Sequence, residues 1–229
     1  MAITVVQVST VANWVGGTTA SPSLTGVTSG NTLIAVYSLA SFFSPPGSVS
    51  VNDGSAYSIE NSQTVTGDTT YNCGIARLGN VGAGTHTAVC TSNGASTYGN
   101  AILVEVSGIQ NVVADKLANN TGSSTTPTSG STGTLSQANE IIFSVLVADS
   151  SLSGFTYPPT GYTGLFQDSG FCPGAACYQI VAANTALNTS WGTASTTTNW
   201  GACAATLLAL AAGTYAPPPF RTFNPVYFM

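Results

Sequence analysis

The sequence is short of charged residues. Asp, Glu, Lys and Arg make up 5% of its 229 residues, against about 25% in an average soluble domain. The cations are Arg77, Lys116 and Arg221, and the formal net charge is -5. Because nucleic-acid binding depends on many contacts between Lys or Arg and phosphates, we expect no nucleic-acid partner. The surface must be kept in solution by hydroxyl and amide groups.

Long apolar runs are also lacking. The longest, residues 141–147 and 204–212, are far shorter than the roughly 20 residues of a transmembrane helix. The opening residues MAITVVQV have no basic region, no sustained apolar stretch and no small-residue cleavage site, all of which mark a secretory signal. The sequence therefore predicts no membrane partner and no signal peptide, with synthesis in a cytoplasm.

Residues that usually carry catalysis or bind metals are few. His86 is the single histidine, and neither a Gly-x-Ser-x-Gly nor a Cys-x-x-Cys motif occurs. A hydrolytic triad needs an imidazole between a nucleophile and a carboxylate, and a zinc site needs clustered Cys and His ligands. The eight acidic residues are scattered among turns and strand ends. We therefore expect no enzymatic activity, no metal and no cofactor, and an exposed position for His86 on a strand.

Short runs of Val, Ile, Thr, Tyr and Phe, bounded by Gly, Asn, Asp, Pro and Ser, are what the chain contains instead. This pattern is typical of strands and turns, and no long window shows the 3.6-residue apolar period of a helix. The pattern predicts an all-β fold with antiparallel strands. The expected strands are 3–8, 31–40, 56–65, 70–78, 85–92, 100–106, 140–148, 162–167, 176–183, 189–194 and 202–210.

The sequence also carries a weak internal repeat. Three pairs of segments match in the same order, namely 31–41 with 139–149, 73–80 with 177–184, and 98–106 with 200–208. They indicate two half-repeats, over residues 31–109 and 139–212. About five strands per half would hardly bury a core alone, so we expect one β-sandwich over residues 1–214. Two small separate sandwiches are the alternative.

A Ser/Thr/Gly-rich stretch, residues 119–133, connects the halves. Its composition is compatible with a flexible linker. Because Thr is also common in edge strands, part of the stretch could pair in a sheet instead. Both interpretations stand at this stage.

The C-terminal arm, residues 215–229, differs from the rest of the chain. Three successive prolines favour an extended backbone, and four aromatic residues follow within nine positions. Aromatic side chains left in water would form an apolar patch that monomers avoid. We expect the arm to form an assembly interface through Pro217, Pro218, Pro219, Phe220, Arg221, Phe223, Tyr227 and Phe228.

The order of strands and turns over 30–38, 49–60, 75–90 and 101–109 resembles the jelly-roll β-sandwich repeats of bacteriophage virion proteins, such as decoration and tail proteins, and of bacterial surface proteins. The similarity covers most of the first half and, more faintly, the second. It includes no catalytic motif, so it supports a fold better than a function. It implies a jelly-roll-like, non-enzymatic sandwich of a virion or a cell surface.

Five cysteines raise the question of disulfides. A symmetric hairpin around Val81 and Gly82 would place Cys73 opposite Cys90, within reach of a bridge. Cys172 and Cys177 could close a small loop. The alternative is that all are buried thiols acting as small apolar residues, as is common in cytoplasmic folding.

Aromatic residues suggest a possible sugar-binding surface. Trp14, Trp191 and Trp200 could offer apolar ring faces for stacking against a glycan. The alternative, which carries more weight, is that these tryptophans fill the core.

Two functions agree with these features. The first is a structural protein of a bacteriophage virion, a capsid decoration or a tail or fibre component, whose partners are other copies of itself and other virion proteins. The second is a carbohydrate-binding or adhesion module of a phage or bacterial surface. The charge-poor composition and the aromatic C-terminal arm favour the first.

Overall fold

The structure, a computed structural model, describes residues 2–41, 48–66, 69–94, 97–150, 152–170 and 172–211. These residues form antiparallel strands and their connections, with no helix among them, and so none that could cross a membrane. The expected all-β sandwich is confirmed. The strands are β1 (Thr4–Val8), β2 (Ala12–Gly17), β3 (Thr19–Ala20), β4 (Ser23–Val27), β5 (Thr32–Ser41), β6 (Val49–Asn52), β7 (Ser58–Val65), β8 (Thr70–Leu78), β9 (Gly84–Thr87), β10 (Val89–Ser92), β11 (Thr97–Ser107), β12 (Leu117–Ser124), β13 (Glu140–Ala148), β14 (Thr163–Asp168), β15 (Gly174–Val181) and β16 (Thr198–Leu208).

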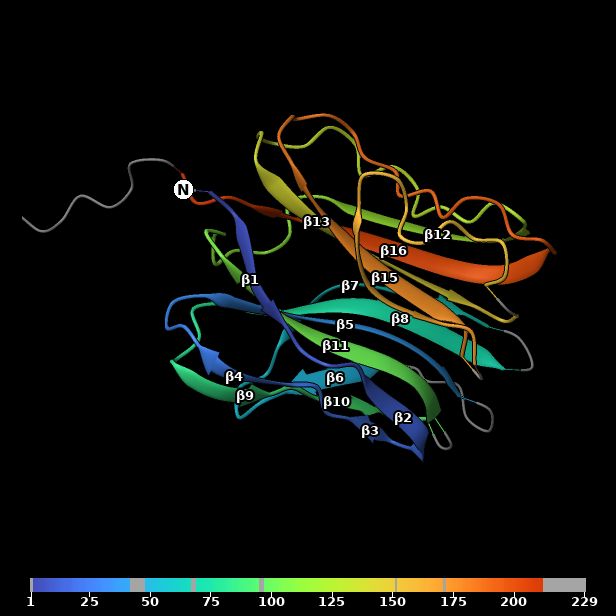
Figure 1. The fold of residues 1–229 in the computed structure, drawn as a ribbon, viewed down its shortest axis with the longest axis horizontal. Helices are drawn as coiled ribbons and strands as arrows, with labels where there is room; N and C mark the ends of the chain where they lie inside the picture. The colour runs from blue at the N-terminus through green and yellow to red at the C-terminus, as the bar shows by residue number, and fades with distance from the viewer. Residues whose placement is uncertain are drawn as a thin grey trace, which may run out of the picture.

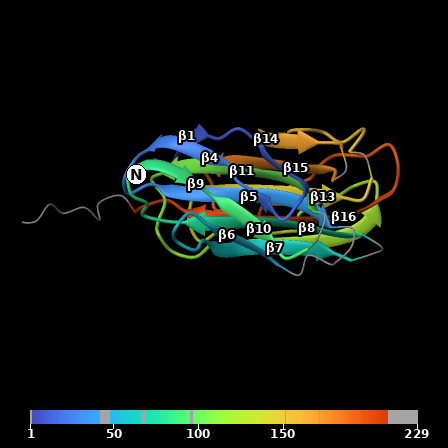
Figure 2. The same ribbon diagram turned by 90° about the horizontal axis from the view of Figure 1, so that it is seen from below.

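The strands are arranged in three layers (Figure 1). The central sheet has the order β1-β11-β5-β8-β7, with β2 also paired to β11. One of its faces is covered by the outer sheet, whose order is β12-β16-β13-β15-β14. The other face is covered by two small sheets, β3-β10-β6 and β4-β9. Figure 2 shows that strands of successive layers run in similar directions, as in aligned sheet packing.

The two large sheets share one strand order. β11, β5 and β8 are neighbours in the central sheet, and β16, β13 and β15 take the same places in the outer sheet. The three sequence matches between the halves fall on these strands. The repeat therefore corresponds to one sheet per half, and the two sheets lie face to face.

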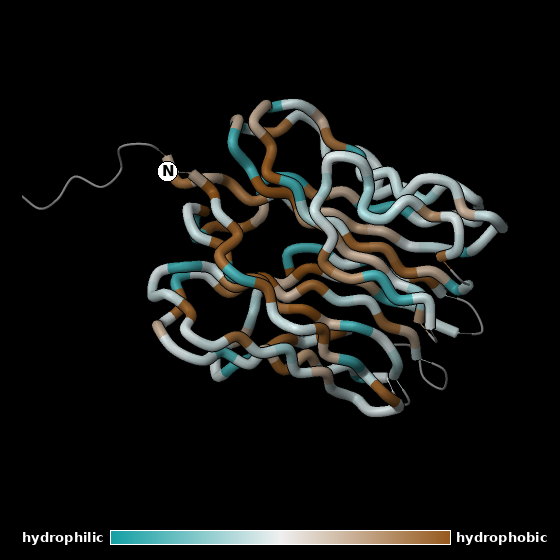
Figure 3. Tube along the Cα trace, in the orientation of Figure 1, coloured by the Kyte–Doolittle hydropathy of each residue, from teal (hydrophilic) through white to brown (hydrophobic). Residues whose placement is uncertain are grey.

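The apolar side chains form a core on each side of the central sheet. One core, with Val36 and Phe143 among its members, lies between the two large sheets. A second, with Tyr37 and Leu103, lies beneath the small sheets. All ten residues of β5 are buried, which explains why its sequence is mostly apolar and does not alternate. Figure 3 shows apolar residues concentrated along these inner strands.

Some expected elements differ from those observed. The expected strand over 189–194 is irregular, with single bridges at Ser190 and Gly192. Strands β2, β3, β4 and β6 were not expected from the sequence, because they are short or rich in Gly, Ser and Thr. In the stretch between the halves, residues up to Ser124 pair with β16 as the edge strand β12.

Candidate functional site

The three tryptophans do not form a sugar-binding surface, and the favoured interpretation, that they fill the core, is confirmed. Trp14 and Trp191 are 1% exposed and Trp200 is 4% exposed. Trp14 packs in the core beneath the small sheets, whereas Trp191 and Trp200 pack under the connections of the outer sheet. Burial of their apolar rings stabilises the fold, and no ring face is left for a ligand.

Cys73 and Cys90 do not face each other, so the expected cross-strand pair is wrong. Cys73 on β8 lies opposite Ser38 and Gln63, and Cys90 on β10 lies opposite Ala20 and Val51. The reason is the turn after β8. Val81 exchanges backbone hydrogen bonds with Gly30 and Asn31, so the chain crosses to the small sheets instead of folding back as a hairpin.

The expected loop closure by Cys172 and Cys177 is also absent. Cys172 belongs to the core between the large sheets, whereas Cys177 points to the opposite face of the outer sheet. All five cysteines are free and buried. Cys73 instead lies beside Cys203, with 4.0 Å between the sulfur atoms, one contributed by each large sheet. The cysteines therefore serve as small apolar core residues.

His86 is paired rather than simply exposed. Its Nδ1 lies 2.6 Å from Asp53 Oδ2 and its Nε2 lies 3.1 Å from the Gly82 carbonyl oxygen. The hydrogen bond to Asp53 raises the pKa of His86, although partial burial opposes the shift. Since both partners accept, both ring nitrogens donate when the imidazole is charged. In that state both nitrogens have partners, and the pair links β9 to the turn after β6.

The C-terminal arm lies outside the described residues. Leu210 donates its backbone N–H to the Gly108 carbonyl oxygen at 2.8 Å, and Ala209 forms a bridge with Ile109. A Cβ atom built on Gly108 would meet the Ala2 carbonyl oxygen at 2.2 Å, which shows how closely the first residues approach this point. The last described residues therefore lie beside the beginning of β1 (Figure 1).

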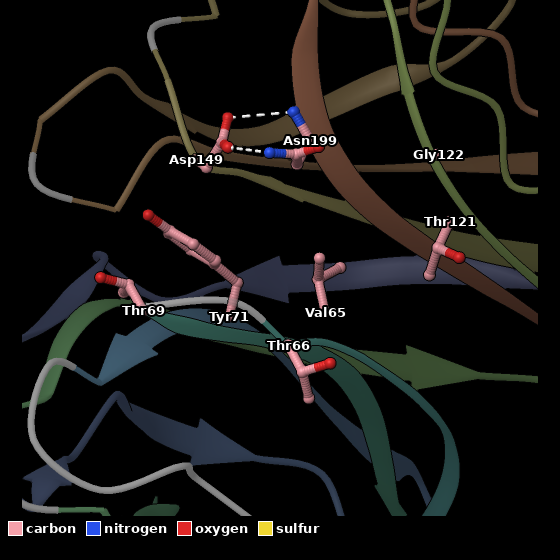
Figure 4. Close-up of a pocket in the computed structure, with 8 residues that line it drawn as sticks. All are labelled: Val65, Thr66, Thr69, Tyr71, Thr121, Gly122, Asp149 and Asn199. Carbon is pink, nitrogen blue, oxygen red and sulfur yellow. Dashed lines mark hydrogen bonds between the residues drawn. The ribbon is translucent and has the colours of Figure 1, made fainter.

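A polar pocket opens where the ends of the two large sheets separate (Figure 4). Its volume is about 510 Å³. The lining comes from the end of β7, the start of β8, the middle of β12, the residue after β13 and the start of β16: Val65, Thr66, Thr69, Tyr71, Thr121, Gly122, Asp149 and Asn199. Hydroxyl, amide and carboxylate groups dominate, with Val65 and the Tyr71 ring as the apolar parts.

Asp149 is the charged group of this pocket. Its Oδ1 accepts hydrogen bonds from Thr198 Oγ1 at 2.7 Å and from the Asn199 backbone at 3.0 Å, and its Oδ2 accepts one from Asn199 Nδ2 at 2.5 Å. Burial, with the Asp149 charge nearby, raises the pKa of Tyr71, so the phenol stays protonated and can donate a hydrogen bond. Among the residues that the structure describes, the lining has no cation, no imidazole and no second carboxylate. This chemistry suits a neutral, hydroxyl-rich ligand.

The second surface feature is the valine edge, which we define as Val6, Val8, Val11 and Val15. These side chains are 46%, 41%, 39% and 78% exposed. They lie on β1, on β2 and on the link between them, which together run along β11 as the edge of the central sheet. Among the described residues, β1 and β2 pair with β11 on one side and with no strand on the other. Apolar side chains here accompany an open strand edge, which is a template for pairing with another segment.

Comparisons of the chain with protein-family models, curated proteins and solved structures find no match. The choice of the pocket and the valine edge as candidate sites therefore rests on their geometry alone. In the sequence, the pocket residues are spread over five elements and carry no shared motif. The valine edge had only a weak signal in the sequence, four valines within ten residues. The same pattern is equally typical of an ordinary strand.

Proposed function

We propose that this protein is a structural component of a bacteriophage virion, a decoration or a tail or fibre constituent, that acts by packing against copies of itself and against other virion proteins. It would do so without catalysing a reaction. The jelly-roll-like resemblance and the charge-poor composition support this proposal.

The valine edge is the observation that carries it. Of ten large apolar side chains exposed among the described residues, four lie on this one edge. A protein that works alone usually protects an edge strand with charged residues or covers it, yet residues 4–17 contain no charge at all. An uncharged, apolar and unpaired edge is suited to contact with another protein.

The test has two parts. Mass spectrometry of purified phage particles, released from cells that carry the coding genome, should detect the protein in many copies per particle. Sedimentation velocity of the purified full chain should show association that grows with protein concentration. A protein missing from the particles, or one that stays monomeric at every concentration, would reject this function.

The pocket at the ends of the large sheets supports a second candidate, a glycan-binding role. Its neutral hydroxyls, the Tyr71 ring and the fixed Asp149 carboxylate are groups that recognise sugar hydroxyls. Saturation-transfer NMR with glucose, galactose and mannose would test it. Binding should be lost in Tyr71→Ala and kept in Tyr178→Ala, which removes a partly buried tyrosine outside the pocket. Absence of transfer to all three sugars would exclude this role for the common neutral hexoses.

A further inference from the structure

We propose that the C-terminal segment, residues 212–229, binds along the valine edge of a second copy of this chain. The inference rests on the proposed function, which requires contacts between copies, and it assigns both sides of one such contact.

The acceptor side is the open edge of the central sheet. β1 pairs with β11 through Val5 and Val8, with a bulge between Val5 and Gln7, and β2 continues the same edge to Gly17. Val8 and Val15 expose their side chains beside this edge. An extended segment could add to it as a further strand, with the valines contacting its side chains.

The donor side has a matching composition. After three prolines come Phe220, Phe223, Tyr227 and Phe228, with Arg221 as the single charged side chain of residues 212–229. Residues 4–17 are uncharged. Asp168, which lines a hollow together with Val15, accepts hydrogen bonds from Asn100 and Gly170, so an almost neutral aromatic segment meets no unpaired charge there. Aromatic anchors of this kind supply much of the energy of protein interfaces.

The position of the last described residues favours a second copy over the same chain. β16 runs toward the point where Leu210 meets Gly108, and β1 starts from that point and runs back across the molecule. To lie on its own edge, the segment would have to reverse within residues 212–216. The prolines at 217–219 then keep it extended. Continuing outward needs no reversal, and 18 extended residues span about 60 Å, enough to reach a neighbour.

Photo-crosslinking in the full chain tests the contact directly. Phe223→p-benzoylphenylalanine keeps an aromatic side chain in the segment and reacts with whatever lies beside it. Equal amounts of ¹⁴N and ¹⁵N chains are mixed, irradiated, digested with pepsin and analysed by mass spectrometry. We expect mixed-isotope products that join the segment to residues 4–17.

A matched pair of variants tests the same contact by affinity. Val8→Thr with Val15→Thr keeps β-branched side chains but removes apolar surface from the valine edge. We expect the dissociation constant of self-association, from sedimentation velocity, to rise about tenfold. The control is Val89→Thr with Val113→Thr, the same two changes at valines that are 37% and 70% exposed elsewhere; it should change the constant less than about twofold. Circular dichroism confirms that both variants fold.

Each result separates the inference from the proposed function. Same-isotope products at residues 4–17 without any mixed-isotope product would mean that the segment covers its own edge, which overturns the inference. Mixed-isotope products at another surface would overturn the assigned edge but leave assembly by packing intact. A chain that neither associates nor cross-links between copies overturns both.

Discussion

Each charged side chain that the structure describes has a partner inside the fold. Glu60 and Arg77 form a buried ion pair at 2.7 Å, and the second Glu60 oxygen accepts the Ala114 backbone N–H at 2.7 Å. Although burial opposes ionisation of Glu105, hydrogen bonds from Thr28, Asn31 and Gln7 hold its pKa below the usual value. The remaining pairs are Asp53 with His86, Asp115 and Lys116 with Ser136, Glu140 with Gln137, Asp149 with Asn199, and Asp168 with Asn100. The few charges that the structure describes therefore serve the fold.

The Glu60–Arg77 pair gives the first prediction. Arg77→Ala would leave a buried carboxylate without its cation and should lower the free energy of unfolding by about 3–5 kcal/mol. The double variant Arg77→Met with Glu60→Gln should lower the free energy of unfolding by less than Arg77→Ala does, because no unpaired charge remains. Lys116→Ala is the control, since its 3.6 Å contact with Asp115 is partly exposed and should contribute about 1 kcal/mol or less. Urea unfolding measures all three; equal losses in Arg77→Ala and Lys116→Ala would contradict the prediction.

The second prediction concerns pH. The pKa of His86 is raised by its hydrogen bond to Asp53, with the Gly82 carbonyl and Glu105 as further favourable groups. Below about pH 6.5 the imidazole is charged in folded and unfolded chains alike, so its hydrogen bond to Asp53 contributes its full share to the free energy of unfolding. The contribution is lost as pH rises through the higher folded pKa. The stability difference between the wild type and His86→Gln should therefore shrink from pH 6 to pH 9. A stability difference that grows with pH would contradict this prediction and show that the hydrogen bond between His86 and Asp53 stabilises the fold when the histidine is neutral.

At the scale of strands, the close contact of the two large sheets depends on residues without side chains. A Cβ on Gly201 in β16 would lie 2.5 Å from Val65 Cγ2, and one on Gly174 in β15 would lie 2.1 Å from Ser38 Oγ. In both places a methyl group would occupy space held by the opposite sheet. Glycine here sets the spacing between layers.

A pair of glycine variants forms the third prediction. Gly201→Ala should lower the free energy of unfolding by about 1–3 kcal/mol, because it overfills a packed contact. Gly17→Ala is the control in another strand, where no atom lies within 4 Å of the added Cβ. It should leave stability unchanged or raise it by less than about 1 kcal/mol. Thermal unfolding compares them, and a neutral Gly201→Ala would mean that the sheets can separate slightly at no cost.

Strands buried on both faces could be predicted well from the sequence. β8 and β13 were expected at their observed bounds and β5 within one residue, because turn-forming residues such as Asn31, Gly79 and Asp149 flank them. The turn after β8 was misread because the residues 79–84 suit a hairpin and a crossing equally well, and contacts of Val81 with Gly30 decide between them. The pocket could not be predicted, since its lining meets only after both sheets have packed.

At the scale of the whole molecule, the layers share side chains and should unfold together. Cys90 lies beneath the small sheets, Cys203 between the large sheets and Cys177 on the far face of the outer sheet. Burial raises the pKa of Cys90 to about 12 and raises the pKa of the other two thiols as well. Three separate apolar clusters of the molecule thus each hold an unreactive thiol.

The fourth prediction uses these thiols as reporters. Native protein should react with Ellman's reagent at none of its five cysteines within minutes, since all are buried. In urea, all should become reactive at one midpoint, because the central sheet belongs to two cores at once. Mass spectrometry of the labelled peptides identifies each site. If Cys90 reacted at a lower urea concentration than Cys203, the small sheets would be an independent unit.

The meeting of Ala2, Gly108 and Leu210 at one pole makes the described chain almost a closed ring. A short linker from residue 211 back to residue 2 would join the ends with little change to either large sheet. New ends could then open in the connection between β12 and β13, on the face away from the valine edge. The fold therefore does not depend on where the chain begins, and a cargo fused at residue 2, or at residue 211 of a chain shortened to that residue, would leave from the same point.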